Sequence, residues 1–225
     1  MLAARDGEES RATQALESLC RTYWYPLYAF LRRQGHSAED AQDLTQGFFA
    51  HLLARDFLRG LSKEHGRFRT FLLAALRNFL ADQWDKARAL KRGGGRPALS
   101  LDEVAAEERY QLEPADELSA DRIYERRWAL TLLDQALARL REEFAAADKA
   151  ELFDVLRQFQ GDEPSPATCA DVAARLGMPE NTFKSHVRRF RQRYRELLCE
   201  AVAQTVATPA EVAEELRHLR SVLAG

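Results

Sequence analysis

The sequence lacks the long apolar segments and the cysteine pairs that mark membrane and secreted proteins. No run of 18 apolar residues occurs, and the N-terminal MLAARDGEESRATQ has no apolar core of the kind found in signal peptides. The three cysteines, Cys20, Cys169 and Cys199, are odd in number and widely spaced, which favours neither a disulfide framework nor a zinc site. We therefore expect a cytoplasmic protein with no membrane partner.

Signals of enzymatic chemistry are missing as well. The five histidines show no metal-ligand spacing with cysteines or acids, no glycine-rich phosphate loop stands beside a strand, and no strand pattern is evident. We expect an all-α protein that is not an enzyme, with no catalytic residues, no metal and no cofactor. At 225 residues, with 46% hydrophobic and 30% charged residues, it can hold two small helical domains.

The most informative segment, residues 166–198, has the spacing of a helix-turn-helix. Thr168 and Asp171 predict a capping box at the start of a short first helix. Gly177 permits a left-handed turn, and Pro179 suits the first turn of a second helix. That second helix has an apolar stripe at i, i+4, i+7 and i+11, formed by Phe183, Val187, Phe190 and Tyr194.

This second helix is also strongly basic. From Arg175 to Arg195 there are seven lysines and arginines against one acid, a net +6 in a chain of net charge −2. A charge run alone is often only a solvated face, but here it coincides with helix-turn-helix spacing, which favours docking in the major groove of DNA. The expected DNA-binding residues are Asn181, Thr182, Lys184, Ser185, Arg188, Arg189 and Arg191.

The first part of the chain shows three amphipathic helices. The first ends before Gly35, which can supply a left-handed stop, and the second begins at a cap formed by Ser37 and Asp40. A polar loop at 59–67 precedes the third, which starts near Phe68 and has apolar residues around its circumference, so we expect it to be central. Apolar positions on the second helix are Ala41, Leu44, Phe48 and Leu52, with Glu39, Asp43 and Gln46 opposite.

Basic residues surround the third helix. Residues 63–96 contain nine lysines and arginines against three acids, interleaved with phenylalanine and tryptophan. Phosphates need positive charge and unstacked bases need flat apolar partners, so the pattern suits a single nucleic-acid strand, although such aromatics are more often core residues. Three glycines within 91–97 end the domain, and the acidic stretch 101–121 is expected to be a flexible tether or, alternatively, a screen for the basic faces.

Helical periodicity resumes over 130–144 and 152–159, which gives two helices ahead of the helix-turn-helix. The chain closes with an amphipathic tail helix that begins at Thr208, Pro209 and Glu211. Its apolar face packs either on its own chain, which is the commoner outcome, or on a partner protein. The predicted division is a domain at 1–96, a flexible acidic linker at 97–125, a domain at 126–204 and a tail at 205–225.

The order of these features resembles one family, the extracytoplasmic-function (ECF) group of bacterial RNA polymerase sigma factors. The resemblance covers most of residues 10–200. DLTQ at 43–46, followed by Phe49, resembles region 2.2 of that family, the helix that docks on the clamp helices of the polymerase β′ subunit. FR at 68–69 and RN at 77–78 resemble regions 2.3 and 2.4, which melt and read the −10 promoter element. The helix-turn-helix, with GMP at 177–179 and TFKS at 182–185, is similar to region 4.2, the reader of the −35 element.

The resemblance implies an initiation factor that binds core RNA polymerase, at its β′ clamp helices and β flap, and directs it to promoter DNA. Residues 38–53 would bind polymerase, residues 63–92 would open the −10 element, and residues 166–198 would bind the −35 duplex. Asn78 and the loop 63–68 would capture a flipped base. The implied polymerase contacts are Glu39, Asp43, Gln46 and Phe49. The implied −10 contacts are Lys63, Arg67, Phe68, Arg69, Arg77, Asn78 and Lys86.

Region 2.2 of this chain is less acidic than is usual in the group. Some ECF subgroups are activated by phosphorylation of a threonine there, which nominates Thr45 as the target of a Ser/Thr kinase. Thr45 also falls at the edge of the apolar arc, where a structural threonine is expected. An anti-sigma factor is the other candidate regulator. The alternative function is a helix-turn-helix transcription regulator that binds DNA without acting as a sigma subunit.

Overall fold

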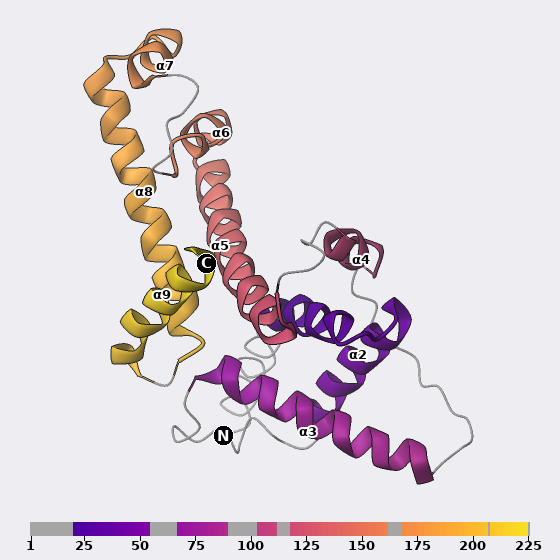
Figure 1. The fold of residues 1–225 in the computed structure, drawn as a ribbon. Helices are drawn as coiled ribbons and strands as arrows, with labels where there is room; N and C mark the ends of the chain where they lie inside the picture. Colours follow the sequence, from indigo (N-terminus) through magenta and orange to yellow (C-terminus); the bar gives the residue numbers. More distant parts are fainter. Residues whose placement is uncertain are drawn as a thin grey trace, which may run out of the picture. The chain divides into compact units, whose positions relative to one another are not determined.

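The computed structural model describes residues 20–54, 67–89, 103–111, 118–161, 168–206 and 208–224. All regular structure within these ranges is helical, which confirms the expected all-α class (Figure 1). The chain divides into two compact units, one formed by Met1–Thr131 with Thr205–Gly225 and the other by Leu132–Gln204. The helix at residues 20–33 is followed by α2 (Ala38–Ala54), α3 (Phe68–Ala89), α4 (Glu103–Gln111), α5 (Ala120–Ala146), α6 (Ala150–Arg157), α7 (Cys169–Arg175), α8 (Glu180–Ala203) and α9 (Pro209–Ala224).

Local signals in the sequence explain where the first helices begin and end. Gly35 has a φ of +94°, the left-handed conformation that stops the helix at residues 20–33. Ser37 then caps α2, because its hydroxyl accepts a hydrogen bond from the Asp40 amide at 3.0 Å. Both predictions are confirmed. Pro26 is buried within the first helix.

The core of the first unit forms where α2 and α3 pack against the helix at residues 20–33. Phe48 on α2 is fully buried, and its ring centroid lies 5.7 Å from that of Phe79 on α3. Leu72 and Leu76 on α3 are buried as well, and Phe68 at its start meets Tyr23 edge-on, with ring centroids 5.2 Å apart. These contacts bear out the prediction that the third helix is central.

Part of the predicted acidic linker is ordered as a helix. Residues Glu103–Gln111 form α4, and Glu107 on this helix accepts hydrogen bonds from Arg32 at 2.8 and 3.0 Å and another from the Tyr28 hydroxyl. The Arg32 guanidinium holds the pKa of the Glu107 carboxyl below its usual range. A count of charges cannot reveal such a partner, because Arg32 lies 75 residues away in the chain.

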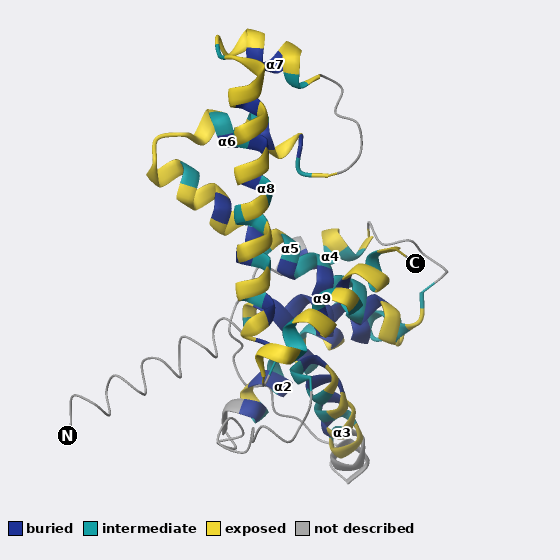
Figure 2. Ribbon diagram, turned by 90° about the vertical axis from the view of Figure 1, so that its left-hand side faces the viewer, coloured by how far each residue is buried: buried dark blue, intermediate teal, exposed yellow. Residues whose placement is uncertain are grey.

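In the second unit, a cluster of aromatic side chains holds α8 against α5, α6 and α7. Phe153, Phe183 and Phe190 are at most 1% exposed, and the rings of Phe144 and Phe190 pack edge-on at 5.7 Å. Each fully buried phenylalanine contributes about 1.5–3 kcal/mol relative to an exposed one. Buried positions recur along α8 between exposed ones, as the apolar stripe predicts (Figure 2).

The tail forms α9 and belongs to the first unit. Its start is capped as predicted, because the Thr208 amide donates a hydrogen bond to the Glu211 carboxylate at 3.0 Å. Its side chains contact Arg67, Arg69 and Glu125, and Leu219 is 3% exposed, so this helix packs on its own chain. The predicted separate tail at 205–225 is thus part of the first unit, and so are the residues of α5 before Leu132.

Candidate nucleic-acid interface

The predicted helix-turn-helix is built by α7, a tight turn and α8 (Figure 1). Thr168 and Asp171 make a complete capping box at the start of α7. At its end Gly177 has a φ of +65°, and the amides of Gly177 and Met178 donate back to the carbonyls of Ala174 and Ala173 at 3.1 and 3.0 Å. This pair of bonds is the Schellman arrangement, which turns the chain sharply into α8.

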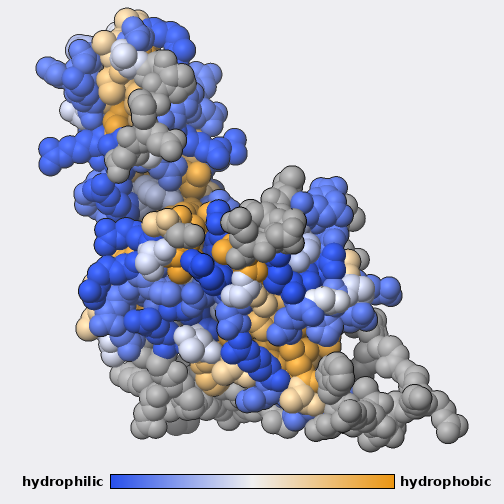
Figure 3. All heavy atoms as spheres, viewed as in Figure 1, coloured by the Kyte–Doolittle hydropathy of each residue, from blue (hydrophilic) through white to orange (hydrophobic). Residues whose placement is uncertain are grey.

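The N-terminal half of α8 presents polar and basic side chains to solvent. Phe183 and Val187 point into the core, so the residues between them lie outward. Hydrophilic side chains cover much of the surface around α7 and α8 on the side seen in Figure 3. The predicted DNA-binding residues that the structure exposes together are Asn181, Thr182, Lys184, Ser185, Arg188 and Arg189.

The arginines of α8 differ in what they contact. Arg188 makes no hydrogen bond or ion pair with any residue that the structure describes, and Arg189 only reaches the Ser185 carbonyl of its own helix at 3.3 Å. Arg191 is a correction to the predicted set, because it donates to the carbonyls of Phe159 and Gly161, both at 2.7 Å, and so fixes the segment after α6 to α8. Its side chain stabilises the unit.

Further along α8, the charge of Arg193 is neutralised. Arg193 forms ion pairs with Glu143 at 2.7 Å, Glu196 at 3.1 Å and Glu200 at 3.5 Å. The hydrogen bond from Arg193 holds the pKa of the Glu143 carboxyl below its ordinary value. Exposed arginines on α8 are Arg188 and Arg189 in the half that begins at Glu180, and Arg195 farther along.

Lys184 has an acidic partner but remains accessible. Its ammonium lies 2.6 Å from the Glu180 carboxylate one turn earlier, and this hydrogen bond raises the pKa of Lys184. The Lys184 side chain is 57% exposed. Such exposed pairs along a helix contribute little, so a phosphate can displace Glu180 at small cost.

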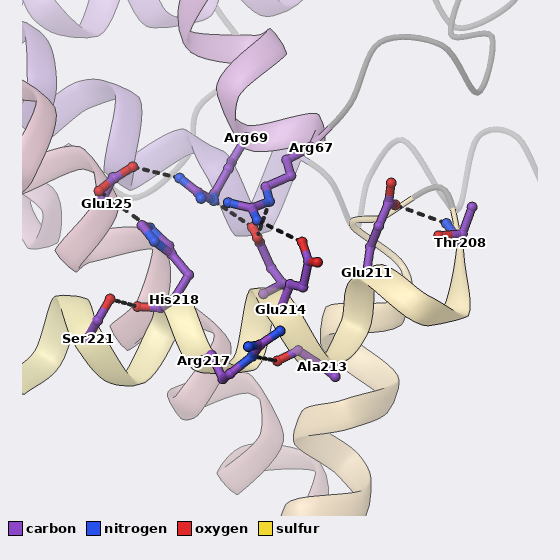
Figure 4. Close-up of polar contacts among 11 residues, drawn as sticks. Arg67, Arg69, Glu125, Thr208, Glu211, Ala213, Glu214, Arg217, His218 and Ser221 are labelled. Atoms are coloured by element: carbon purple, nitrogen blue, oxygen red, sulfur yellow. Dashed lines mark hydrogen bonds and ion pairs between the residues drawn. The ribbon is translucent and has the colours of Figure 1, made fainter.

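In the first unit, the arginines at the start of α3 face acidic side chains. Arg69 is 4% exposed and forms ion pairs with Glu215 at 2.5 Å and Glu125 at 2.6 Å (Figure 4). Arg67 lies 3.1 Å from Glu214 and 3.2 Å from Glu215. The prediction that Arg69 holds a DNA phosphate is therefore wrong for this conformation, because its guanidinium is buried under its own chain.

Other predicted −10 residues lie farther along α3. Arg77 pairs with Asp121 but stays half-exposed, and it borders an open hollow of about 720 Å³ that Gln34, Gly35 and His36 also line. Asn78 is exposed, which leaves it available to a base. Phe68 is half-buried against Tyr23. Lys63 and the loop up to residue 66 lie outside the described residues, as does the side chain of Lys86.

The predicted polymerase contacts on α2 divide into two groups. Glu39 and Asp43 are exposed and face away from the core as expected, whereas Gln46 is half-buried and its side-chain nitrogen is covered. Phe49 is 8% exposed and its ring packs against Phe48 at 5.9 Å. Phe49 is therefore a core residue rather than a polymerase contact, since its ring is already covered.

Thr45 is fully buried on α2, and its hydroxyl donates to the Ala41 carbonyl at 2.6 Å. A kinase cannot reach this hydroxyl without opening the unit, and a phosphate buried there would carry a large desolvation cost. The phosphosite prediction is wrong for the folded unit. The structural threonine that the helical wheel also allowed is what the structure contains.

Sequence reasoning missed the residues that surround Arg67 and Arg69. Glu125, Glu214, Glu215 and His218 come from α5 and α9, and the His218 Nε2 lies 3.4 Å from Glu125. Burial, and next the charge of Arg69, lower the pKa of His218. One signal in the sequence could have revealed the burial of Glu215. This residue falls at i+3 from Val212 and i−4 from Leu219, on the apolar stripe of the tail helix.

Comparisons with protein-family models, with curated proteins and with solved structures found no match for this chain. Among the described residues, none of the helices has the length and apolar character needed to cross a membrane. Function is therefore inferred from the residues and their geometry.

Proposed function

We propose that the protein is a sigma-type transcription initiation factor that binds duplex DNA through α7 and α8. The observation that carries this proposal is the exposed group at the start of α8, in which Asn181, Ser185 and Arg188 follow one another along one side of the helix. A second helix that enters the major groove with its N-terminal residues is the usual docking of a helix-turn-helix. Arg188 and Arg189 neutralise phosphates, while Asn181, Thr182 and Ser185 contact base edges.

The first unit supplies the rest of the proposed activity. Glu39 and Asp43 on α2 form the acidic surface that docks on a basic surface of core polymerase. Arg77, which lines an open hollow, and Asn78 are both exposed on α3, and they engage the separated strand of the −10 element. An initiation factor needs both activities, since the −35 element is bound as duplex and the −10 element as an opened strand.

The burial of Arg69 and Phe49 favours a second candidate. Two residues that the family resemblance assigns to strand and polymerase binding are covered in this conformation. A helix-turn-helix regulator that never joins polymerase would need neither of them on the surface. This candidate keeps the α8 interface and predicts no stable complex with core polymerase.

Run-off transcription separates the two candidates. Purified core polymerase would be mixed with the protein and a library of promoter fragments, and transcript ends would be sequenced. An initiation factor gives specific start sites that core polymerase alone does not give. Specific duplex binding without any start site would contradict the proposal and support the regulator.

Two variants make the assay specific to the proposed surfaces. Arg188→Ala should reduce the specific starts about tenfold, because it removes an open phosphate contact. Asp43→Lys should abolish them by losing polymerase, with duplex binding unchanged. Arg195→Ala, at an exposed arginine two turns farther along α8, is the matched control for the first. Equal activity of Arg188→Ala and Arg195→Ala would remove the α8 interface from the proposal.

A further inference from the structure

The tail helix α9 places two carboxylates on the two arginines that begin α3 (Figure 4). We propose that Arg67 and Arg69 form a site for the phosphates of single-stranded DNA, and that Glu214 and Glu215 of α9 occupy this site in the free protein. The strand and α9 then compete for the same guanidinium groups, so α9 inhibits strand binding until it is displaced. This inference rests on the proposed function, because it names how the −10 surface is regulated.

The contacts have the geometry of an anion site. Arg69 donates through Nε to Glu215 Oε1 at 2.5 Å and through Nη1 to Glu125 Oε1 at 2.6 Å. Arg67 reaches Glu214 Oε2 at 3.1 Å and Glu215 Oε2 at 3.2 Å. Four carboxylate oxygens thus surround two guanidinium groups, and phosphate oxygens bind the same planar donors in the same way.

The charge of the site depends on α9. With α9 docked, Arg67 and Arg69 face three carboxylates, those of Glu125, Glu214 and Glu215. Without α9 the two arginines keep only Glu125. The site therefore changes from net −1 to net +1, counting these side chains alone, and only the second state attracts a phosphate.

Burial on α9 is unusual for a helix that serves only as structure. Its two buried residues are Leu219 and Glu215, and Glu215 is 1% exposed. A carboxylate at the centre of the packed face costs desolvation that an apolar residue would not, so its presence is explained by a requirement for negative charge on Arg67 and Arg69. Polar docking of this kind can be exchanged for another anion, whereas an apolar contact cannot.

The packing around α9 also leaves space. A cavity of about 210 Å³ lies where α9 meets the start of α5, and it is lined by Arg122, Glu125, Arg126, His218 and Ser221 among others. The chain enters α9 from α8, which belongs to the second unit, so α9 can leave α3 and α5 without breaking the path of residues 1–131. Incomplete packing and this connection both favour a helix that detaches.

The first experiment measures strand affinity. A fluorescein-labelled oligodeoxynucleotide of about 12 nucleotides, within the usual site size for single strands, is titrated with full-length protein. Every protein carries Arg188→Ala, which weakens binding of DNA through α8. Glu214→Gln with Glu215→Gln should bind about tenfold more tightly, and its salt slope should steepen by about 1.4 for two freed phosphate contacts. Glu211 lies on the same helix and accepts a hydrogen bond from the Thr208 amide. Glu211→Gln is therefore the control, and it should not change strand affinity.

The gain must come from the arginines themselves. Adding Arg67→Ala to the double glutamine variant should remove about half of the added salt slope, because one of the two phosphate contacts is lost. A gain that survives Arg67→Ala would arise elsewhere and would overturn the proposal.

Hydrogen exchange tests the competition without any substitution in α9. A saturating concentration of the single strand should raise the exchange rate of amides in residues 209–224 at least tenfold. If α9 and the strand compete for the same arginines, binding of the strand must weaken the docking of α9. Unchanged or slower exchange in α9 with the strand bound would overturn the proposal, even if the glutamine variants failed to fold.

The outcomes also separate this inference from the proposed function. Tighter strand binding by the glutamine variants, with no start sites from core polymerase, would leave the inference standing and remove the initiation factor. Specific start sites, with unchanged strand affinity in those variants, would leave the initiation factor and overturn the inference.

Discussion

The arginines of α8 and those at the start of α3 differ in their surroundings, although the sequence around both is equally basic. Each segment, 175–195 and 63–96, carries a net +6. On α8, Arg188 is exposed and contacts no described acid. On α3, Arg69 is buried between Glu125 and Glu215. Arg188 is thus accessible to a ligand, whereas Arg69 is already paired with carboxylates of its own chain.

This difference shows that local charge predicts a binding surface only where the chain itself supplies no counter-ion. The acids that neutralise Arg69 lie 56 and 146 residues away in the sequence, so no local window contains them. The acids near α8 come from α5 and from α8 itself. Glu143, Glu196 and Glu200 pair with Arg193, and Glu180 pairs with Lys184. Four predictions test this contrast, beginning with the largest effect.

Identical truncations in the two regions should change the free energy of unfolding by very different amounts. Arg69→Ala leaves Glu215 buried with only Arg67 beside it, so the free energy of unfolding should fall by about 3 kcal/mol, the lower end for a broken buried pair. Arg188→Ala is an exposed change and should stay within about 0.5 kcal/mol. Urea denaturation followed by circular dichroism measures both. Equal losses would show that Arg69 is not the structural member of the pair.

Within α8, open and paired arginines should differ in duplex binding. Arg188→Ala should weaken binding to promoter duplex about tenfold, because a charge-assisted hydrogen bond contributes about 1.5–3 kcal/mol, and should reduce the salt slope by about 0.9. Arg193→Ala should change affinity much less, since its charge is shared with Glu143 and Glu200. Fluorescence anisotropy at several salt concentrations distinguishes them. A larger loss for Arg193→Ala would reverse the assignment.

The two left-handed glycines offer a matched pair across the units. At Gly177 (φ +65°) and Gly35 (φ +94°), no atom lies within 4 Å of the position that an added methyl group would occupy, so alanine at either site strains only the backbone. Each substitution should cost about 1–2 kcal/mol of stability. Only Gly177→Ala should also weaken duplex binding, because it alters the turn into α8. Loss of duplex binding by Gly35→Ala would contradict the assignment of duplex binding to α7 and α8.

The smallest predicted effect concerns pH. Arg193 lowers the pKa of Glu143 below its ordinary 4.5, so the unfolded chain binds this proton more readily than the folded one. The stabilisation is therefore present above the unfolded pKa and is lost as the pH falls through the folded pKa. Since both side chains are exposed by 38–40%, it amounts to less than about 1 kcal/mol. Glu143→Gln should flatten the decline in melting temperature below pH 5, and an unchanged profile would refute the coupling.

Local signals allowed most helix ends and the turn of the helix-turn-helix to be predicted. Ser37 with Asp40, Thr168 with Asp171, and Gly177 act through neighbours within a few residues, so their effects are legible in sequence. The apolar stripe of α8 was predictable for the same reason, because a helix repeats every three to four residues.

Burial and long-range pairing were not predictable from those signals. Phe49 and Thr45 lie at the border of the apolar arc on α2, where one packing partner decides between core and surface. Arg191 donates hydrogen bonds to two carbonyls after α6, which occupies the side chain predicted to bind DNA. Glu107 forms an ion pair with Arg32. Each outcome depends on which helices meet, which local periodicity does not contain.

Arginine-specific chemical modification tests the central contrast most directly. The native protein would be treated with a dicarbonyl reagent, with and without promoter duplex, and the modified sites located by mass spectrometry. We expect fast modification of Arg188 and Arg189, strong protection of both by duplex, and slow modification of Arg69 in either sample. Rapid modification of Arg69 in the free protein, or no protection of Arg188 by duplex, would contradict the contrast between the two regions.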